Sequence, residues 1–429
     1  MLSIEQTIEM LNTSKAGTLL SHLYGQEQLS YQLDRYSALV KSFQAHFEDG
    51  KLALFSSPGR SEIVGNHTDH NHGKVLAGSI NLDTIAAAVQ VDEPIITFIS
   101  EGYPGKFIVD ITQSEPNPNE PATLSLVRGI VAGFSEFGYS VGGFNAYIST
   151  NVLSASGLSS SASFEMLICS ILNTFYNQGT LDSIAMAKIG QYAENKYWNK
   201  PSGLLDQMAC AHGGLISIDF ANPYKPVITP VRFDFQQNGY SLVIVNTGGN
   251  HADLTDDYGA VPKEMRSVAK ALGAEVCRDL TPNDIYGNLN SLRNQCGDRA
   301  VLRALHFFAE NKRVDAQTES LTNGNMEQFL KLIADSGNSS WKWLQNCYRN
   351  ADIRHQEITV ALAITESFLK DIGTGACRVH GGGFAGVILT IIPNEAAQSY
   401  TRFIKDTLGT STYIINVREH GSICLNDII

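Results

Sequence analysis

The amino-acid sequence predicts an α+β protein. Its 429 residues include 43% hydrophobic and 17% charged side chains, the composition of an ordinary globular protein. At roughly 150 residues per domain, this length favours two or three domains, each able to bury its own core. Strand-like and helix-like segments follow one another without a regular βαβ repeat. This irregular order favours an α+β fold over a doubly wound sheet.

The elements can be assigned in chain order from hydrophobic periodicity. Residues 1–50 have a helix-like pattern, and a buried strand at 52–57 is expected to end in a turn at Pro58-Gly59. The proline-rich segment 111–121 cannot form regular structure and is expected to be a loop. The other expected elements are strands at 84–91, 144–148, 242–246 and 387–392, and helices at 124–134, 164–175 and 358–372.

The charge balance argues against nucleic acid and membranes as partners. The chain has 31 basic and 43 acidic residues, and its formal net charge of −12 repels both polyanions and anionic lipids. The N-terminus lacks the features of a secretory signal, and no apolar run reaches the length of about 18 residues needed to span a membrane. Seven dispersed cysteines form no CxxC pair. We therefore expect a cytoplasmic protein with reduced thiols.

A loop rich in serine and glycine, residues 157–163, lies between an expected strand and an expected helix. A helix N-terminus presents free N–H groups and about half a positive charge, and small residues let a phosphate approach closely. The loop lacks the Gly-Lys-Ser/Thr end of a Walker A motif. A simple serine helix cap would have the same appearance. The sequence thus allows either a phosphate site or a cap.

A polar turn lies earlier in the chain, between Arg60 and Gly73. It contains Asn66, His67, Asp69 and His70, a mixture of donors and acceptors that suits a polyhydroxylated ligand. The histidines of this turn could instead hold a metal ion, although their spacing matches no familiar zinc motif. A solvated turn without a ligand is the third interpretation.

Two further segments contain candidate site residues. Gly381–Gly383 and Gly386 precede an expected strand, where glycine permits a positive φ or the close approach of another group. A tight turn without a ligand would also explain them. Asp206 lies among apolar residues, where a carboxylate needs a cation or a hydrogen-bond donor. A core ion pair explains Asp206 as well as catalysis does.

Taken together, these segments resemble the galactokinase family, within the GHMP superfamily of sugar and small-molecule kinases. The match runs in order from about Leu52 to the C-terminus. Arg60–Gly73 resembles the signature GRVNxIGEHTDYNxG, and Gly157–Ala162 is identical to the phosphate loop GLSSSA. The remaining matches are Glu194 with the element A-E-x, Gly203–Gln207 with G-x-x-D-Q, Asn250–Tyr258 with R-H-x-L-x-x-S-E-Y, and Gly381–Gly386 with GGGFGG.

The resemblance implies a two-domain, GHMP-kinase-like α+β fold with the active site in the cleft between the domains. We expect an N-terminal helical segment (1–50), an N-terminal kinase domain (51–220) and a C-terminal kinase domain (221–429). The implied reaction is galactose plus ATP to galactose 1-phosphate plus ADP, with Mg²⁺ as a cofactor. A sugar and a nucleotide would be the partners, and the oligomeric state stays open.

The resemblance also implies roles for individual residues. Asp206 would be the catalytic carboxylate, and Arg60 would hold it ionised and stabilise the transferring phosphoryl group. Ser161 and Glu194 would coordinate Mg²⁺. The nucleotide phosphates would bind to Gly157, Leu158, Ser159, Ser160, Ser161 and Ala162. The sugar would bind to Asn66, His67, Asp69, Gly203 and Tyr258.

The chain departs from the family pattern mainly at the sugar signature. Asn66 replaces Glu and His70 replaces Tyr; the other changes are Ser61-Glu62 for Val-Asn, Asn250 for Arg, and Ala385 for Gly. Because Asn66 lacks the ionised acceptor of Glu, we expect the hydrogen bond to a neutral sugar hydroxyl to be weaker by roughly 1–3 kcal/mol. We also expect the site to tolerate a carboxylate on the sugar. Three functions stay open: a galactokinase, a kinase for a related uronic acid or amino sugar, and a non-catalytic sugar sensor.

Overall fold

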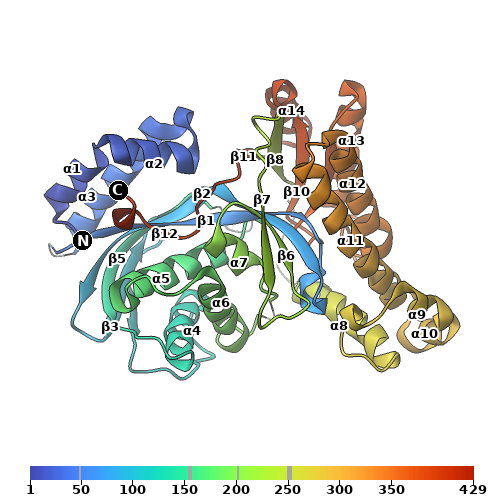
Figure 1. The fold of residues 1–429 in the computed structure, drawn as a ribbon, viewed down its shortest axis with the longest axis horizontal. Helices are drawn as coiled ribbons and strands as arrows, with labels where there is room; N and C mark the ends of the chain where they lie inside the picture. The colour runs from blue at the N-terminus through green and yellow to red at the C-terminus, as the bar shows by residue number, and fades with distance from the viewer. Residues whose placement is uncertain (48–49, 153–156, 201, 249–253) are drawn as a thin grey trace.

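The protein is described by a computed structural model that covers residues 1–47, 50–152, 157–200, 202–248 and 254–429. It contains two β-sheets with helices packed against them, which confirms the α+β class (Figure 1). The strands are β1 (Ala53–Val64), β2 (Lys74–Val91), β3 (Ile95–Ser100), β4 (Phe107–Asp110), β5 (Gly143–Thr150), β6 (Leu215–Asp219), β7 (Val227–Val231), β8 (Tyr240–Asn246), β9 (Ala376–His380), β10 (Val387–Pro393), β11 (Thr412–Ile415) and β12 (Ile423–Cys424). The helices are α1 (Ile4–Leu11), α2 (Ser14–Tyr24), α3 (Leu29–His46), α4 (Ala122–Glu136), α5 (Ser160–Asn177), α6 (Ser183–Lys196), α7 (Leu205–His212), α8 (Thr255–Ala271), α9 (Pro282–Gly287), α10 (Leu289–Cys296), α11 (Asp298–Thr322), α12 (Met326–Ser339), α13 (Glu357–Ile372) and α14 (Asn394–Leu408).

The larger sheet has the order β12-β1-β2-β5-β3-β4, with β6 paired to β2 and β7 paired to β6. Its neighbours are antiparallel except β3 and β5, which are parallel. Alternate residues of a strand face opposite sides of a sheet. Phe55, Ala86 and Ala88 therefore share a core with α4, α5 and α6, whereas Leu54 and Ala87 share another core with α1, α2 and α3. The N-terminal helices thus cover the second face of this sheet.

The smaller sheet has the order β11-β8-β10-β9, with antiparallel neighbours throughout. Val243 and Ile388 pack with α13 and α14 on one face. Leu242 and Leu389 lie on the other face and share a core with α11, α12 and Ile63 of β1. Because this core includes residues from both sheets, it holds the two halves of the chain against each other.

The structure corrects the prediction made for the first strand. Pro58 and Gly59 do not form a turn: β1 continues through them, with a register shift between Pro58 and Arg60. Proline is compatible with such an irregular point because it has no N–H to contribute to the pairing. Gly59 permits a close approach, since a Cβ there would lie 2.7 Å from the carbonyl oxygen of Leu158. The glycine therefore lets the serine-rich loop lie directly against β1.

The remaining elements agree with the expectations from periodicity. The expected helices correspond to α4, α5 and α13, and three of the expected strands correspond to β5, β8 and β10. The strand expected at 84–91 begins earlier, at Lys74, and the proline-rich segment 111–121 has no helix or strand. The domain boundary near residue 220 stays a prediction. In chain order, β7 belongs to the larger sheet and β8, the next strand, belongs to the smaller sheet.

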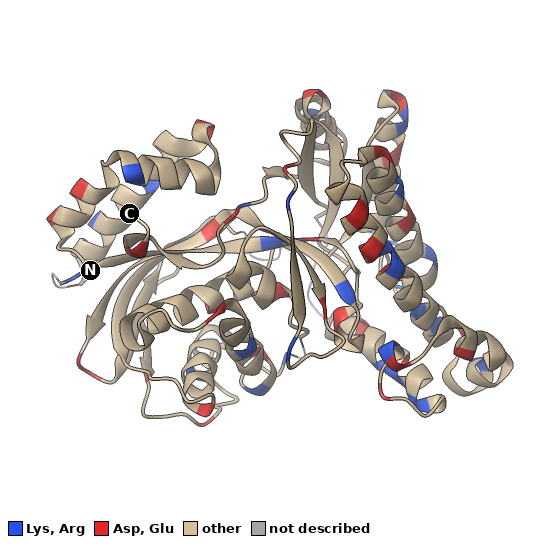
Figure 2. Cartoon of the chain, viewed as in Figure 1, with Lys and Arg blue, Asp and Glu red and all other residues tan. Residues whose placement is uncertain are grey.

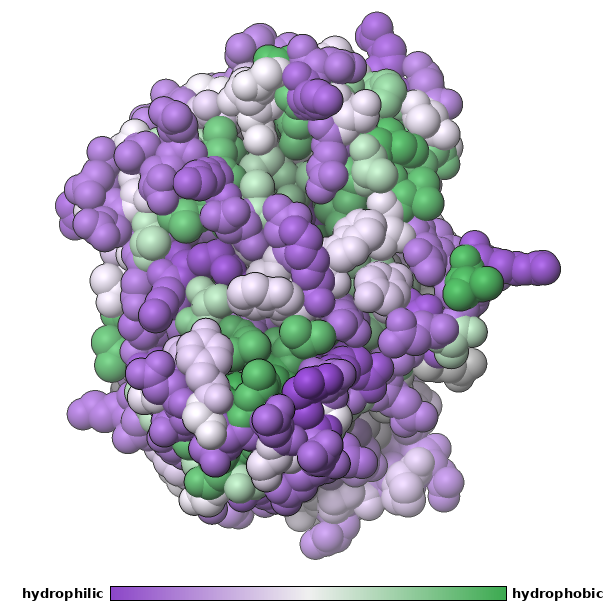
Figure 3. All heavy atoms as spheres, turned by 90° about the vertical axis from the view of Figure 1, so that its right-hand side faces the viewer, coloured by the Kyte–Doolittle hydropathy of each residue, from purple (hydrophilic) through white to green (hydrophobic). Residues whose placement is uncertain are grey.

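Charged side chains of both signs are interspersed along the chain, for example on α8 and α11 (Figure 2). On the face seen in Figure 3, hydrophobic side chains form small groups separated by hydrophilic ones. Within the described ranges, no helix is long and apolar enough to cross a membrane.

Candidate active site

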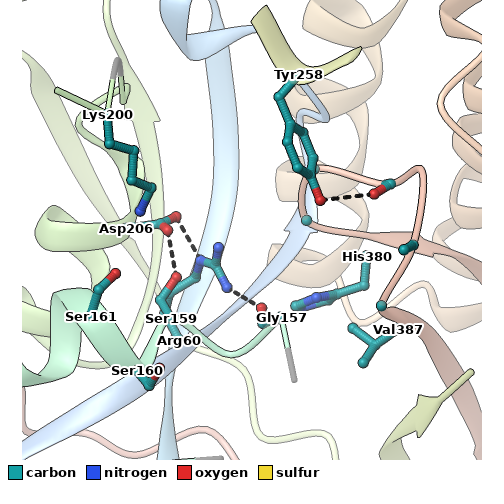
Figure 4. A pocket seen from close by; sticks show the side chains of 15 residues that line it. Arg60, Gly157, Ser159, Ser160, Ser161, Lys200, Asp206, Tyr258, His380 and Val387 are labelled. Carbon is teal, nitrogen blue, oxygen red and sulfur yellow. Dashed lines mark hydrogen bonds and ion pairs between the residues drawn. The ribbon is translucent and has the colours of Figure 1, made fainter. Parts of the chain in front are cut away.

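A pocket lies between the serine-rich loop (residues 157–163) and the glycine-rich loop (residues 381–386) (Figure 4). Its wall from the first half of the chain consists of Arg60, Gly157, Ser159, Ser160, Ser161, Lys200 and Asp206. Its wall from the second half consists of Tyr258, His380, Gly381, Gly382, Gly383, Ala385, Gly386 and Val387. Other residues expected at the site are not among the described residues that line this pocket: Asn66, His67, Asp69, Leu158, Ala162, Glu194 and Gly203.

Arg60 and Asp206 form an ion pair at the pocket. Arg60 comes from β1 and Asp206 from the first turn of α7, and the distance between Arg60 Nε and Asp206 Oδ1 is 2.8 Å. A second guanidinium N–H of Arg60 donates to the carbonyl of Gly157 at 2.5 Å, and the Ser159 hydroxyl donates to Asp206 Oδ2. Burial raises the pKa of Asp206, but Arg60 and Ser159 outweigh it, so the pKa is lowered. The carboxylate is therefore held ionised.

The start of α5 has an unusual backbone that serves this ion pair. Ser159 is the N-cap residue, yet its φ of 57° and ψ of 58° lie in the left-handed region, and its side chain makes no capping hydrogen bond. This region is sparsely populated by residues other than glycine, so it needs support from its surroundings. The hydroxyl is used for Asp206 instead of the helix. Leu158 and Ala162 are fully buried, and only their backbone can serve a ligand.

A second cluster of charged groups surrounds Glu194 of α6. Ser161 Oγ donates to Glu194 Oε1 at 3.2 Å, and Lys200 Nζ lies 2.5 Å from the same oxygen. Gln207 Nε2 donates to one carboxylate oxygen each of Glu194 and Glu165, both at 3.0 Å. Burial and the nearby Glu194 raise the pKa of Glu165 well above its usual value, so Glu165 is held as the neutral acid.

The oxygen donors of this cluster fit a magnesium ion. Mg²⁺ prefers oxygen ligands and is usually held by one or two protein groups together with the phosphates of a nucleotide. The Ser161 hydroxyl and the Glu194 carboxylate are such groups and lie within 3.2 Å of each other. No group of three or more His, Cys, Asp or Glu side chains suited to a metal occurs in the described part of the chain. A metal ion here would therefore depend on nucleotide phosphates for further ligands.

The histidines of the polar turn form a chain of hydrogen bonds. His67 Nε2 donates to the carbonyl of Gly382 at 2.8 Å, which leaves its Nδ1 to accept from His70 Nε2 at 3.3 Å. His70 Nδ1 accepts in turn from Asn71 Nδ2 at 3.0 Å. Burial lowers the pKa of His67 to about 4 and that of His70 well below its usual value. The four ring nitrogens of His67 and His70 all have partners, and no group of three or more His, Cys, Asp or Glu side chains suited to a metal occurs among the described residues. The turn therefore does not support the metal interpretation.

Asp69 and Gly203, two predicted sugar-binding residues, lie in contact. A Cβ at Gly203 would overlap the Asp69 carboxylate. Burial, together with the nearby carboxylates of Asp206 and Glu62, raises the pKa of Asp69 to about 7. At neutral pH the Asp69 carboxyl group can thus both donate and accept hydrogen bonds.

Tyr258 of α8 lines the opposite wall of the pocket. Its ring packs so closely on Gly382 that a side chain there would overlap it, and its hydroxyl donates to the carbonyl of Gly383 at 3.1 Å. Phe384 meets the same ring edge-on, with centroids 5.6 Å apart. Asn250, which stands where the family pattern has Arg, lies outside the described residues.

Asn66 is fully buried, and its side-chain amide is occupied by internal hydrogen bonds. Its Nδ2 donates to Glu62 Oε1 at 3.0 Å and to the Gly381 carbonyl at 2.6 Å. Its Oδ1 accepts from Asn346 Nδ2 at 2.7 Å and from Ser340 Oγ at 3.3 Å. Asn66 therefore joins the polar turn to the glycine-rich loop.

The two neighbouring departures from the family pattern, Ser61 and Glu62, face strand β9. His380 Nε2 accepts the Glu62 backbone N–H at 3.2 Å and lies 3.0 Å from the Ser61 hydroxyl. Arg378 donates to Glu62 Oε1 at 3.1 Å. The changed positions thus belong to one network between the polar turn and the end of β9.

Several residues of this site were not found from the sequence. His306 and Glu310 on α11 bind the backbone of the polar turn: His306 Nε2 donates to the Asn66 carbonyl at 2.9 Å, and Gly65 N donates to Glu310 Oε1 at 3.2 Å. Their spacing of four residues places them on one helix face, the only signal that the sequence offers. Nothing in the sequence connects Lys200 to Glu194.

Two family models match the chain. The galactokinase galactose-binding signature matches residues 41–90, and the N-terminal domain of GHMP kinases matches residues 125–214. Curated galactokinases from Clostridium tetani and Lactobacillus helveticus are each 28% identical over 372 and 374 residues, covering 86% and 85% of this chain and 91% and 92% of those proteins. The chain belongs to the galactokinase family.

The solved structures agree with this family assignment. Lactococcus lactis galactokinase complexed with galactose superimposes with a TM-score of 0.79 at 25% identity, covering 90% of this chain and 99% of that chain. Methanococcus jannaschii mevalonate kinase shares the fold with a TM-score of 0.60 at 16% identity, covering 86% of this chain and 99% of that chain. The expected GHMP-kinase-like fold is confirmed.

Proposed function

We propose that this member of the galactokinase family phosphorylates galactose with ATP to give galactose 1-phosphate and ADP. The observation that carries the proposal is the 2.8 Å ion pair between Arg60 and Asp206, in a pocket with a helix N-terminus on one side and a glycine-rich loop on the other. Phosphoryl transfer depends on in-line positioning and charge neutralisation more than on covalent chemistry. This pocket can supply both.

Asp206 is the proposed acceptor of the proton. A sugar hydroxyl is a weak nucleophile, and an ionised carboxylate within hydrogen-bond reach can take its proton. The sugar oxygen then bonds to the γ-phosphorus while the bond from that phosphorus to the oxygen of the β-phosphate breaks. Arg60 holds Asp206 ionised and places a fixed positive charge beside the reacting groups.

The N-terminus of α5 is the proposed phosphate site. The free N–H groups of its first turn, with the hydroxyls of Ser160 and Ser161, suit the phosphate oxygens. Ser161 and Glu194 are the proposed ligands of Mg²⁺, which when bound neutralises part of the phosphate charge. Gly157 has a φ of 69°, a conformation open to glycine, and its small size leaves room next to the loop.

The proposed sugar site lies next to Asp206, around Asp69, Gly203, His67 and Tyr258. Asp69 is well suited to a neutral hydroxyl because its pKa near 7 lets it donate or accept. Asn66 acts on the sugar indirectly in this proposal, because its amide is already bonded to the glycine-rich loop.

The structural surroundings disfavour a uronic acid as the substrate. The tolerance for a carboxylate was expected because Asn66 replaces an ionised Glu. However, Glu62 supplies a carboxylate that accepts a hydrogen bond from Asn66 at 3.0 Å. Asp69 and Asp206 add further carboxyl groups nearby, and like charges close together repel. A neutral sugar is therefore the better match.

We also propose that the protein acts in the cytoplasm. All seven cysteines are free thiols, and six of them are buried. Reduced cysteines of this kind are typical of proteins in a reducing compartment.

The experiment that tests the proposed function is a coupled assay of ADP release with galactose, its epimers, amino sugars and uronic acids. We expect the largest kcat/KM for galactose. If another sugar gives the largest kcat/KM, the protein is a kinase of different specificity. If ADP is released no faster than the water background with every sugar, the sensor alternative is supported. Binding of galactose, measured by calorimetry, separates a sensor from an inactive preparation.

A further inference from the structure

Lys200 is a charged residue of the pocket to which the mechanism above gives no role. It lies beyond the end of α6, and its backbone N–H donates to the carbonyl of Glu194 at 3.0 Å. Its side chain passes over the ring of Trp198, with Nζ 4.7 Å from the ring centroid. Its Nζ ends 2.5 Å from Glu194 Oε1, and 43% of the side chain is exposed. Figure 4 shows the ammonium group next to Asp206, on the pocket side.

The position of this ammonium group conflicts with the proposed metal ligands. Lys200 Nζ and the Ser161 hydroxyl both contact the same oxygen, Glu194 Oε1. If Mg²⁺ takes that oxygen, as proposed above, a lysine ammonium cannot keep the same contact because the two cations repel each other. In this structure the Lys200 ammonium group therefore supplies the positive charge next to Glu194. With Mg²⁺ bound, the metal ion would supply that charge instead.

The nearest alternative partner of the displaced ammonium is the nucleotide itself. Lys200 lines the same pocket as Arg60, Ser160 and Ser161, and the flexible stem of a lysine can swing its charge by several ångströms. The opposite wall of the pocket consists of glycine-rich backbone with Tyr258, Ala385, Val387 and His380. Burial lowers the pKa of His380 well below its usual value, so this wall offers no positive charge. Phosphate oxygens entering this pocket would thus meet two cations, Arg60 and Lys200, on one side.

We propose that Lys200 is a catalytic residue that exchanges partners: it neutralises Glu194 when the pocket holds no nucleotide, and it binds the terminal phosphate oxygens of a nucleoside triphosphate when Mg²⁺ takes Glu194. The proposal rests on the kinase function proposed above. It adds a second cation to Arg60 for the charge of the transferring phosphoryl group. The exchange would also couple nucleotide binding to metal binding. Binding of Mg²⁺ and binding of the nucleotide both draw the Lys200 ammonium group away from Glu194.

The test is nucleotide binding measured by calorimetry in the absence of sugar, with Lys200→Met and Lys200→Arg. A charge-assisted hydrogen bond to phosphate corresponds to a change of about 10- to 100-fold in Kd. We expect Lys200→Met to weaken ATP binding at saturating Mg²⁺ by this amount and to lower kcat, while Lys200→Arg keeps most of both. Lys200→Met should also bind Mg²⁺–ATP at a lower Mg²⁺ concentration than the wild type, because no ammonium competes for Glu194.

Lys196 provides a matched control. It lies in the last turn of α6, where its Nζ is 4.5 Å from the ring centroid of Tyr192, and it does not line the pocket. Lys196→Met should leave the Kd for ATP unchanged. Circular dichroism checks the fold, and Lys200→Gln replaces Lys200→Met if the latter misfolds.

The outcomes separate this proposal from the proposed function. If Lys200→Met binds ATP at saturating Mg²⁺ as tightly as the wild type, Lys200 is only the counter-ion of Glu194 and the proposal is wrong, whatever the turnover. If the wild type releases no ADP with any sugar but Lys200→Met still loses ATP affinity, the galactokinase activity is wrong and Lys200 remains a nucleotide-binding residue.

Discussion

The two sides of the active site use their polar groups in opposite ways. On the phosphate side, Arg60, Asp206 and Lys200 face the pocket, and their charges are available to a ligand. On the side of the polar turn, the groups of Glu62 and Asn66 are directed at other parts of the protein, and Asn66 has no exposed surface. The first side presents charged groups to the pocket, and the second side holds the glycine-rich loop next to it.

This difference teaches that a departure from a family motif has different consequences on the two sides. A changed residue on the phosphate side would meet the ligand directly. The changed residues at Ser61, Glu62 and Asn66 instead contact one another or the segment from Arg378 to Gly381, and Asn66 also contacts Ser340 and Asn346. The family pattern has Asn and Glu at the positions of Glu62 and Asn66, so the carboxylate has exchanged places with the amide. A change in specificity does not follow from this exchange alone.

The largest effect is expected on the phosphate side, from Asp206→Asn. The amide keeps the shape of the side chain but cannot accept a proton from the sugar. We expect kcat to fall by about 10²- to 10⁴-fold, the usual contribution of a general base. Calorimetry should show that galactose still binds. A variant with nearly normal kcat would remove Asp206 from the chemistry and leave the phosphate side without its proposed base.

Most of the residues on this phosphate side were named from the sequence, and the structure brings Arg60, Asp206 and the serine-rich loop to one pocket, while their roles stay predictions. The GLSSSA loop is contiguous, and Asp206 is marked by its apolar neighbours and a short motif. The partners of Asn66, by contrast, come from positions such as Asn346 and Gly381, far away in the chain. Hydrogen bonds between distant segments leave no spacing that can be read locally. The error at Pro58-Gly59 has a similar cause, because the loop that Gly59 accommodates lies about a hundred residues further on.

The exchange of carboxylate and amide can be tested directly with Asn66→Glu. The new carboxylate would lie next to that of Glu62 and against the carbonyl of Gly381, both of which repel it. We expect the free energy of unfolding to fall by about 3 kcal/mol, as for other buried, unpaired charges. Urea denaturation measures this change.

The double variant Glu62→Asn/Asn66→Glu restores the family order and provides the control. It removes one of the two facing carboxylates, so we expect it to regain most of the lost stability. Coupling of this kind is the signature of residues in contact. Strict additivity of the two single changes would mean that the positions do not act as a pair.

The pH dependence of kcat distinguishes the two roles of Arg60. Asp206 is active when ionised, and its pKa lies below the usual value of 3.8, so kcat of the wild type should hold as the pH falls toward 4. Arg60→Met removes the largest of the contributions that lower the pKa of Asp206, so this pKa rises. The acid limb of kcat should therefore move to a higher pH, in addition to the lower plateau caused by the lost charge. Arg60→Lys keeps a charge and should move the limb less. An unmoved limb in Arg60→Met would show that Arg60 does not control the ionisation of Asp206.

The smallest expected effect lies where the two sides meet, at Gly203. A Cβ in Gly203→Ala would overlap the Asp69 carboxylate, which lies at the end of a side chain and can shift. The unfolding free energy should therefore change by less than about 1 kcal/mol. If Asp69 binds a sugar hydroxyl, the shift should raise KM for galactose by about 10-fold, the cost of one weakened hydrogen bond, and leave the Kd for ATP unchanged.

Gly179→Ala, at a glycine with nothing near its Cβ position but a φ of 72°, serves as the control for a substitution that affects only the backbone. A rise in KM for both substrates would mean that Gly203 supports the whole pocket. The phosphate side and the side of the polar turn would then not be independent of each other.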